Sequence, residues 1–209
     1  MPDTLTGVGG TLYVFLRHAE SVANAGGWLS GWEDVALTET GVAQARAAAA
    51  TLADLPLGRI LVSDLGRARH TAALVLTQVI ARRGPIPVHV LGDLRERRMG
   101  IFQGVNIASA RADGTMSRYM LPWGAHPPGG ESHAEVAARA IATLRAWEDG
   151  TPTRVVAHGS LLRNVVGLLD EVPVEEIGRS RAAVHAEPMI RIVTRWPAVP
   201  PGEDTPHGG

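Results

Sequence analysis

The feature that most constrains the fold is a pattern that occurs three times in this chain of 209 residues. A short apolar run stops abruptly at polar or small residues, and a segment with helical periodicity follows. The runs are TLYVFL (11–16), RILV (59–62) and TRVVA (153–157). Apolar runs that end in this way are typical of central strands in a parallel sheet, because such strands are buried on both faces.

The other segments predict the remaining elements. Helices are predicted in SDLGRARHTAALVLTQVIARR (63–83), HGSLLRNVVGLLDEV (158–172), LTETGVAQARAAAATLADL (37–55) and ESHAEVAARAIATLRAW (131–147), and strands in IPVHVL (86–91) and PMIRIV (188–193). Ser132 and Glu135 have the spacing of a capping box. Strands that alternate with helices predict an α/β fold, namely a three-layer helix–sheet–helix sandwich with a mostly parallel central sheet and a small cap or insertion.

The two ends of the chain differ in composition from the rest. Residues 1–11 are rich in Gly and Thr, which predicts a flexible N-terminal arm, and the Pro- and Gly-rich residues 197–209 predict a flexible tail. Between them we predict a single catalytic domain over residues 12–196, with the cap at about 103–130.

Composition excludes several classes of function. The chain has no cysteine and no lysine, so all 20 basic residues are arginine. Thiolate chemistry, a Walker-A lysine and a Schiff-base lysine are therefore excluded, whereas arginine suits bidentate recognition of phosphate. A net charge of −1 gives no indication of nucleic acid or membrane binding. The N-terminus lacks the pattern of a signal peptide and no apolar run is long enough to span a membrane, so we expect a cytoplasmic protein.

Polar side chains follow the three apolar runs at the points where the runs end. Arg17 and His18 follow the first, Ser63 and Asp64 the second with Arg67 one turn later, and His158 and Gly159 the third. In an open parallel sheet, ligands bind outside the carboxyl ends of the strands. If the three strands are neighbours, two histidines and two arginines converge beside the N-termini of helices, which also favour anions. This arrangement predicts a site for a phosphoryl group.

With these residues in place, the chain resembles the histidine phosphatase superfamily, also called the phosphoglycerate mutase-like family. The resemblance covers about 150 residues and consists of six segments in order: LRHAES, GWEDVALTETGVAQA, SDLGRARHTA, LRERRMGIFQG, PPGGES and VVAHGSLLR. The first segment has Ala19 where the family usually has Gly. That methyl group is expected to be tolerated if the backbone φ there is negative.

The resemblance implies a role for each matching residue. His18 is the expected nucleophile that forms a phosphohistidine, Arg17 and Arg67 clamp the non-bridging oxygens, and His158 donates a further hydrogen bond. Glu96 is the expected general acid, which then serves as base toward water. The alternative for His158 is a satisfied turn residue, and for Glu96 it is a surface ion pair with a neighbouring arginine.

Further contacts are expected around the phosphate. Ser21, Asn24 and the backbone N–H of Gly159 are candidates, although helix capping or surface solvation would also explain Ser21 and Asn24. Ser63 is expected to shape its turn, and Arg163 either braces the site or is a solvated residue. The remaining histidines, expected mostly at the surface or in packing, are His70, His89, His126, His133, His185 and His207. No group of residues has metal-ligand spacing, so no metal and no cofactor are expected.

Two activities share a phosphohistidine, and the sequence favours the phosphatase. Mutases of this family have a long insertion before the Glu-Ser helix, with lysine and an Arg-Arg pair, and a tyrosine shortly after the acid. Here about 30 residues separate Gln103 from Glu131, and the only cations in this span are Arg111 and Arg118. Met99 stands where the mutases have the tyrosine. We therefore predict hydrolysis of a small organic phosphomonoester. The alternatives are a cofactor-dependent phosphoglycerate mutase and a non-catalytic phosphate-binding relative.

Aromatic and apolar residues are expected around the mouth of the site. Trp28 and Trp32 follow the nucleophile closely and are predicted to line it. Apolar residues of the cap, with internal packing as the alternative, could form a lid: Met116, Tyr119, Met120, Leu121 and Trp123. The oligomeric state is not predicted, although apolar residues of the C-terminal strand would be compatible with a homodimer.

Overall fold

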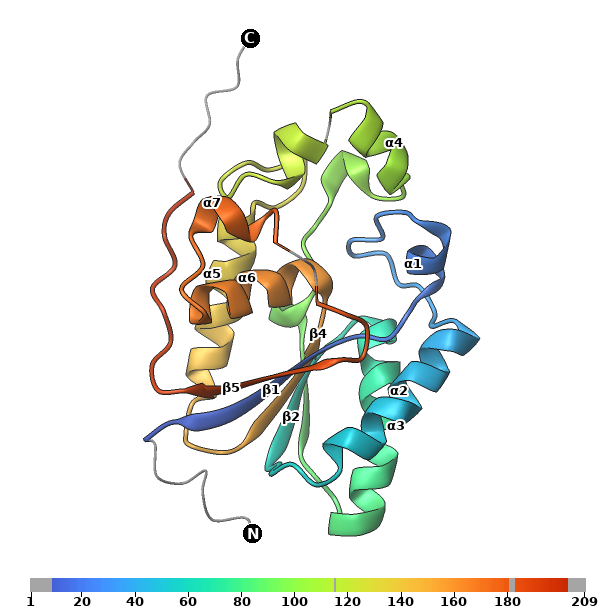
Figure 1. Cartoon of the computed structure of the whole chain (residues 1–209), viewed down its shortest axis with the longest axis vertical. Helices are drawn as coiled ribbons and strands as arrows, with labels where there is room; N and C mark the ends of the chain where they lie inside the picture. The colour runs from blue at the N-terminus through green and yellow to red at the C-terminus, as the bar shows by residue number, and fades with distance from the viewer. Residues whose placement is uncertain (1–8, 115, 181–182, 203–209) are drawn as a thin grey trace.

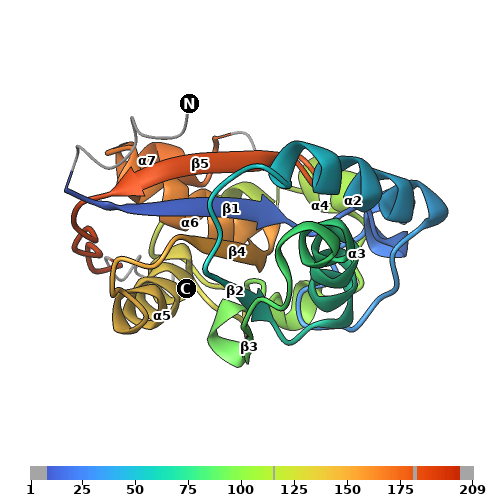
Figure 2. The same ribbon diagram turned by 90° about the horizontal axis from the view of Figure 1, so that it is seen from below.

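A five-stranded sheet organises the fold. The computed structural model describes residues 9–114, 116–180 and 183–202. The strand order is β3-β2-β4-β1-β5, seen edge to edge in Figure 2. Their bounds are β1 (Thr11–Arg17), β2 (Arg59–Ser63), β3 (Val88–Leu91), β4 (Thr153–Ala157) and β5 (Pro188–Val193). β1, β2, β3 and β4 are parallel, and β5 runs antiparallel to β1 at the edge. The predicted mostly parallel sheet is confirmed.

Helices cover both faces of the sheet. α2 (Glu39–Leu52) and α3 (Gly66–Arg83) lie on one face, and α5 (His133–Ala146) and α6 (Gly159–Leu169) lie on the other (Figure 1). The predicted three-layer sandwich is therefore confirmed. Shorter helices are α1 (Val22–Gly26), η1 (Gly92–Leu94), η2 (Gly100–Phe102), α4 (Ile107–Ala112), the π-helical turn η3 (Met116–Met120) and α7 (Val174–Ile177).

The central strands are buried because their side chains alternate between two cores. In β1, Tyr13 and Phe15 pack against the α5 and α6 side, whereas Val14 and Leu16 pack against α2 and α3. A strand that contributes side chains to both cores cannot alternate apolar and polar residues, so its sequence is an uninterrupted apolar run. The runs in the sequence therefore predicted the central strands correctly.

Local signals fix where the long helices begin. Ser132 caps α5, and Glu135 closes the reciprocal hydrogen bond of the predicted capping box. Thr38 caps α2 through its side chain, which accepts the N–H of Gly41. In both cases a side-chain oxygen satisfies a backbone donor that the helix cannot use. These caps place the first turns of the two helices at fixed positions.

Described residues near both ends of the chain contact the domain. β1 already begins at Thr11, which is buried and donates a hydrogen bond to Glu148. Pro197 and Pro200 accept hydrogen bonds from Arg145 and from the indole of Trp123. Within the predicted tail, residues 197–202 are described, and these two prolines connect them to the domain. Residues 1–8 and 203–209, including His207, lie outside the described residues.

The cap segment is tied to the domain through one buried cation. Arg97 is fully buried, and its guanidinium donates to the carbonyl oxygens of Tyr119, Met120, Ala125 and Glu131 and to His133 Nε2. These contacts use all five N–H groups of the guanidinium. Met120 and Trp123 were predicted either to form a lid or to pack inside the cap. Both are buried, so they pack inside and do not form a lid.

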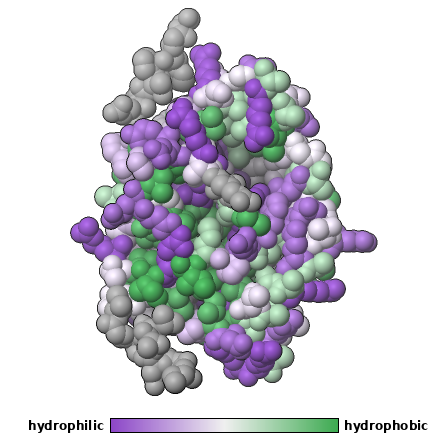
Figure 3. All heavy atoms as spheres, in the orientation of Figure 1, coloured by the Kyte–Doolittle hydropathy of each residue, from purple (hydrophilic) through white to green (hydrophobic). Residues whose placement is uncertain are grey.

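Exposed apolar side chains occur on both edge strands. Val88 and Val90 are exposed on β3, and Ile190 is 44% exposed on β5. The face drawn in Figure 3 carries an apolar area over β5 and the neighbouring α6. The possible homodimer through the C-terminal strand stays a prediction. Among the described residues, the longest apolar helices are still too short or too polar to cross a membrane.

Candidate active site

The carboxyl ends of β1, β2 and β4 bring the predicted site residues together. These strands are neighbours in the sheet, so His18, Ser63 and His158 meet at one edge. The rings of His18 and His158 lie 5.2 Å apart between centroids, and His158 Nε2 is 2.8 Å from Ser63 Oγ. The predicted convergence is confirmed. Ser63 is in direct hydrogen-bond contact with His158, whereas the sequence indicated only a turn residue.

His18 is held with one ring nitrogen free. Its Nδ1 lies 2.8 Å from the carbonyl oxygen of Ala19, and because a carbonyl only accepts, Nδ1 carries the proton. Nε2 then has the lone pair, and no hydrogen bond to it is found within the described residues. Burial, followed by the charges of Arg67 and Arg17, holds the pKa of His18 well below its usual value. The ring is therefore a neutral imidazole suited to nucleophilic attack.

The turn after β1 fixes the direction of the His18 ring. The Ala19 N–H donates to Thr71 Oγ1 at 3.0 Å, which ties the turn to α3. The non-glycine residues with positive φ in the described ranges are Glu171 and Ala186, so φ of Ala19 is negative. The methyl group of Ala19 thus needs no strained backbone, as the sequence analysis required.

Three arginines surround a cavity of about 130 Å³ beside His18, and they are Arg17, Arg67 and Arg163. Arg17 Nη1 donates to the carbonyl of Ala183 at 2.9 Å. Arg67 is fully buried on α3, and Arg163 projects from α6. Burial lowers the pKa of all three guanidinium groups, and the charge of Glu96 opposes that effect. The cavity is therefore strongly cationic.

Several buried donors around this cavity lack partners. Arg17 Nε, Arg67 Nε and Arg163 Nε have no hydrogen-bond partner among the described residues. His158 Nδ1 also has none, but His158 is not among the residues that line the cavity. Buried donors without partners are rare, and a cluster of them indicates that something else satisfies them. Because the donors are mainly cationic and surround one cavity, an anion with several oxygens matches them best.

Glu96 is docked on the N-terminus of α6. Its carboxylate accepts the backbone N–H groups of Arg97 at 2.7 Å, Ser160 at 3.1 Å and Leu161 at 3.3 Å. Its side chain also lines the cavity and is 9% exposed. Arg95 pairs instead with Asp64, so the surface ion pair considered for Glu96 is not formed with that neighbour.

The three weaker predictions have different outcomes. Ser21 is fully buried, caps α1 and donates its hydroxyl hydrogen to Asn24 Oδ1 at 2.8 Å. The capping alternative therefore holds for Ser21, which does not line the cavity. Asn24 and Gly159 do line it. A Cβ at Gly159 would lie 3.3 Å from the Arg17 guanidinium carbon, so glycine allows that close approach.

Part of the cavity lining is apolar. It consists of Trp28, Leu29, Met99 and Ile107, the last from α4 in the cap. Trp28 therefore lines the mouth as predicted. The prediction for Trp32 is wrong, because its ring stacks near Arg95 and Arg98 and does not line the cavity.

His185 is a neighbour of the site that the sequence analysis missed. Its ring centroid lies 5.8 Å from that of His18, and it precedes β5, which begins where the antiparallel β1 ends. Its Nε2 is buried with no partner in the described part of the chain, and burial lowers its pKa to about 4. The signal would have been the antiparallel direction of β5, which the sequence does not reveal.

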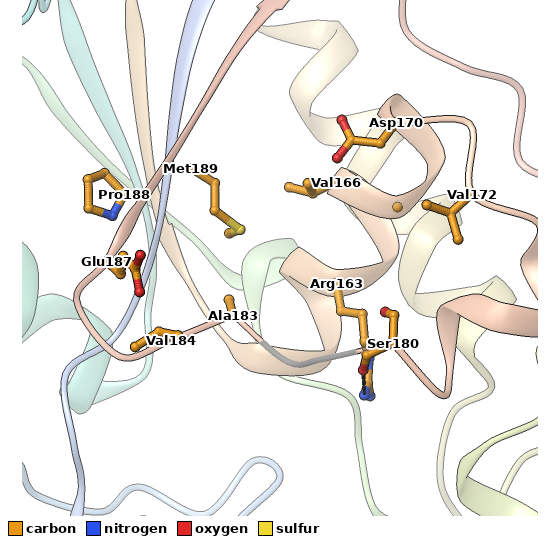
Figure 4. Close-up of a pocket in the computed structure, with 11 residues that line it drawn as sticks. Arg163, Val166, Asp170, Val172, Ser180, Ala183, Val184, Glu187, Pro188 and Met189 are labelled. Carbon is orange, nitrogen blue, oxygen red and sulfur yellow. Dashed lines mark hydrogen bonds between the residues drawn. The ribbon is translucent and has the colours of Figure 1, made fainter.

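A second, larger cavity lies between α6 and the segment leading into β5 (Figure 4). It measures about 410 Å³, and Val166 and Met189 face it from the two sides. Arg163 lines both cavities. Because His18, Glu96 and all three arginines line the smaller cavity, the chemistry is assigned there. Among the described residues, no three His, Asp or Glu side chains are grouped as metal ligands.

Comparison with known proteins agrees with this geometry. The family model of the histidine phosphatase superfamily (branch 1) matches residues 13–191. The 2,3-bisphosphoglycerate-dependent phosphoglycerate mutase 2 of Gloeobacter violaceus is 33% identical over 174 residues, which cover 79% of this chain and 78% of that protein. A mycobacterial glucosyl-3-phosphoglycerate phosphatase structure is 31% identical with a TM-score of 0.74 and covers 87% of this chain and 89% of its own. Its complex with inorganic phosphate is 29% identical with a TM-score of 0.69, covering 90% and 97%. The chain therefore belongs to the histidine phosphatase superfamily, branch 1.

Proposed function

We propose that the protein is a metal-independent phosphomonoesterase that hydrolyses a small organic phosphate through a phosphohistidine on His18. The observation that carries the proposal is the group of unpartnered buried Nε–H donors on Arg17, Arg67 and Arg163, which line one cavity together with His18. A phosphoryl group brings several acceptor oxygens to those donors and presents its phosphorus to the imidazole.

The first step transfers the phosphoryl group to the enzyme. The lone pair of His18 Nε2 forms a bond to phosphorus while the bond from phosphorus to the ester oxygen breaks. Glu96 donates its proton to the departing oxygen, which leaves as an alcohol. Arg17, Arg67 and His158 hold the charge on the non-bridging oxygens throughout the step.

The second step returns the enzyme to its starting state. Glu96, now a carboxylate, takes a proton from a water molecule that attacks phosphorus. The bond between phosphorus and Nε2 breaks, inorganic phosphate leaves, and His18 recovers its lone pair. The proton that Glu96 lost is thereby restored, so no cofactor is consumed.

Hydrolysis is favoured over mutase activity by the state of Arg97. This residue directly follows the acid, a position from which a cation could contact a second anionic group of a substrate. Here the guanidinium is fully buried and donates its N–H groups to the cap and to His133. It therefore has no donor left for a ligand. The apolar wall formed by Trp28, Leu29 and Ile107 instead suits a substrate with an uncharged organic group.

Mutase activity is the second candidate, because a curated relative at 33% identity carries that name. A mutase keeps water out and returns the phosphoryl group to another hydroxyl. The two activities are separated by supplying 3-phosphoglycerate with 2,3-bisphosphoglycerate as primer. Isomerisation faster than phosphate release would favour the mutase.

The test of the proposed function is hydrolysis of an aryl phosphate by the pure protein, with and without EDTA. We expect turnover that EDTA does not reduce and that His18→Ala abolishes. His70→Ala is the matched control, because His70 is an exposed residue of α3. Absence of turnover by the folded wild type would contradict the phosphatase and point to the mutase or to a binding protein.

A further inference from the structure

Trp32 connects the loop after α1 to the backbone of the proposed acid. Its indole Nε1 donates a hydrogen bond of 2.7 Å to the carbonyl oxygen of Glu96. The indole is half-buried and lies outside the residues that line the cavity. Any effect of Trp32 on the reaction therefore passes through Glu96 and not through a contact with the substrate.

The residues on either side of Trp32 are held by a phosphate-site arginine. Arg67 Nη2 donates to the carbonyl of Gly31 at 2.8 Å, and Arg67 Nη1 donates to the carbonyl of Glu33 at 2.7 Å. Arg67 is 1% exposed, so these charge-assisted hydrogen bonds are shielded from water. The backbone around Trp32 is thus fixed relative to the cationic site.

The Trp32 ring also lies against two arginines that are close to Glu96 in the sequence. The guanidinium carbons of Arg95 and Arg98 lie 4.8 Å and 5.4 Å from the ring. Both arginines are within two positions of Glu96, and Arg95 is itself anchored to Asp64 by an ion pair of 2.6 Å. Cation–π contacts of this kind orient the ring so that its N–H points at one carbonyl.

A second donor completes the support of the Glu96 backbone. Arg139 Nη2, from α5, donates to the same carbonyl oxygen at 3.0 Å. The Glu96 carbonyl is therefore held from two sides, by the Trp32 loop and by α5. Of these two supports, the Trp32 loop is the one that is hydrogen-bonded to Arg67, a proposed phosphate ligand.

From these connected hydrogen bonds we infer that Trp32 is a positioning residue. It holds Glu96 at a fixed place relative to the phosphate that Arg67 binds. The inference rests on the proposed phosphatase mechanism and deepens it. A general acid works only within hydrogen-bond reach of the leaving oxygen, and a displacement of about 1 Å can cost about a hundredfold in rate.

The test uses Trp32→Phe and two substrates of similar size, phenyl phosphate and 4-nitrophenyl phosphate. Phenolate is a poor leaving group that needs a proton from Glu96, whereas 4-nitrophenolate leaves without one. Phe keeps an aromatic ring for Arg95 and Arg98 but lacks the indole N–H. We expect kcat/KM to fall about tenfold for phenyl phosphate and to change less than about twofold for 4-nitrophenyl phosphate.

Two controls separate positioning from general damage. Trp147→Phe is the matched substitution, because Trp147 also lies against an arginine, Arg59, but at the opposite end of the strands. Trp147→Phe should leave kcat/KM unchanged for both substrates. Inhibition by inorganic phosphate should also be the same in Trp32→Phe and in the wild type, since the carbonyls that Arg67 contacts are backbone groups.

The results distinguish failure of the positioning role from failure of the proposed phosphatase activity. An equal loss for both substrates, or no loss for either, overturns the positioning role while the phosphatase stands. A wild type that hydrolyses neither substrate overturns the proposed function, and the inference falls with it. Trp32→Tyr, which also lacks the indole N–H, provides the same comparison if the Phe variant is unstable.

Discussion

The carboxylate of Glu96 lies 3.1 Å from the backbone nitrogen of Ser160, in the first turn of the helix that follows His158. The proposed acid and the proposed phosphate contact His158 are therefore fixed to the same piece of backbone. This relationship ties the two groups to one helix N-terminus, because the Glu96 carboxylate accepts the backbone N–H of the second residue after His158.

Glu96→Gln is expected to separate the two chemical steps. The amide cannot donate a proton or accept one from water, so steady-state turnover should fall about a hundredfold or more. With 4-nitrophenyl phosphate the first step needs no acid, so the variant should release one equivalent of nitrophenol rapidly and then stall as the phosphoenzyme. Rapid-mixing absorbance would show this burst, and unchanged steady-state turnover would contradict the role of Glu96.

Gly159→Ala is expected to weaken phosphate binding without weakening the fold. The added methyl group would lie 3.3 Å from the guanidinium carbon of Arg17 and would push it away from the site. Loss of one charge-assisted hydrogen bond would raise the inhibition constant of inorganic phosphate roughly fivefold.

The same substitution provides its own stability control. Alanine is a better helix former than glycine, so the free energy of unfolding should stay equal or rise slightly. Parallel measurement of urea unfolding and phosphate inhibition would distinguish the two effects. A loss of stability together with unchanged inhibition would mean that Arg17 does not contact the phosphate.

Much of this site could be predicted from the ends of the apolar runs. Arg17, His18 and His158 follow strands that are central and parallel, and the parallel direction alone requires them to meet at one edge. The capping box at Ser132 was equally visible, since it depends on residues three positions apart. Local periodicity and strand direction are thus sufficient for these features.

Other features depend on contacts between distant segments and could not be read from the sequence. His185 reaches His18 because β5 pairs antiparallel with β1, a choice of direction that PMIRIV does not encode locally. Trp32 was assigned to the cavity because it follows the nucleophile closely, but its indole turns to a carbonyl 64 positions away. Arg97 lies among charged neighbours in sequence, yet its partners come from the cap.

Stability is expected to decrease as the pH falls below about 6.5, because buried histidines must remain neutral. Burial lowers the pKa of His133 to about 3, whereas in the unfolded chain it titrates near the ordinary value of 6.5. Below that ordinary value the unfolded chain binds a proton that the folded protein does not, so acid favours unfolding. The stabilisation is complete above about pH 6.5 and is lost progressively toward about pH 3.

The magnitude follows from linkage. His133 alone should remove about 1.4 kcal/mol of unfolding free energy per pH unit within this window. Urea unfolding at two pH values in the window would measure the slope. His133→Gln should be less stable near neutral pH, since its contacts with Asn164 and Arg97 are altered, but should show a shallower decrease. An identical slope in the variant would contradict the assignment.

Arg97→Met is expected to loosen the cap and destabilise the protein. The substitution leaves the carbonyls of Tyr119, Met120 and Ala125 without their buried donor. A buried acceptor that loses its donor costs about 1–3 kcal/mol, so the loss of these hydrogen bonds together should cost at least about 3 kcal/mol. Arg98→Met is the matched control, because Arg98 is the adjacent residue and is exposed, so its loss should cost about 1 kcal/mol or less. Urea unfolding gives both values, and limited proteolysis should cut the Arg97→Met variant first within residues 116–125. Equal stability of the two variants would mean that the cap is held by its apolar contacts and not by Arg97.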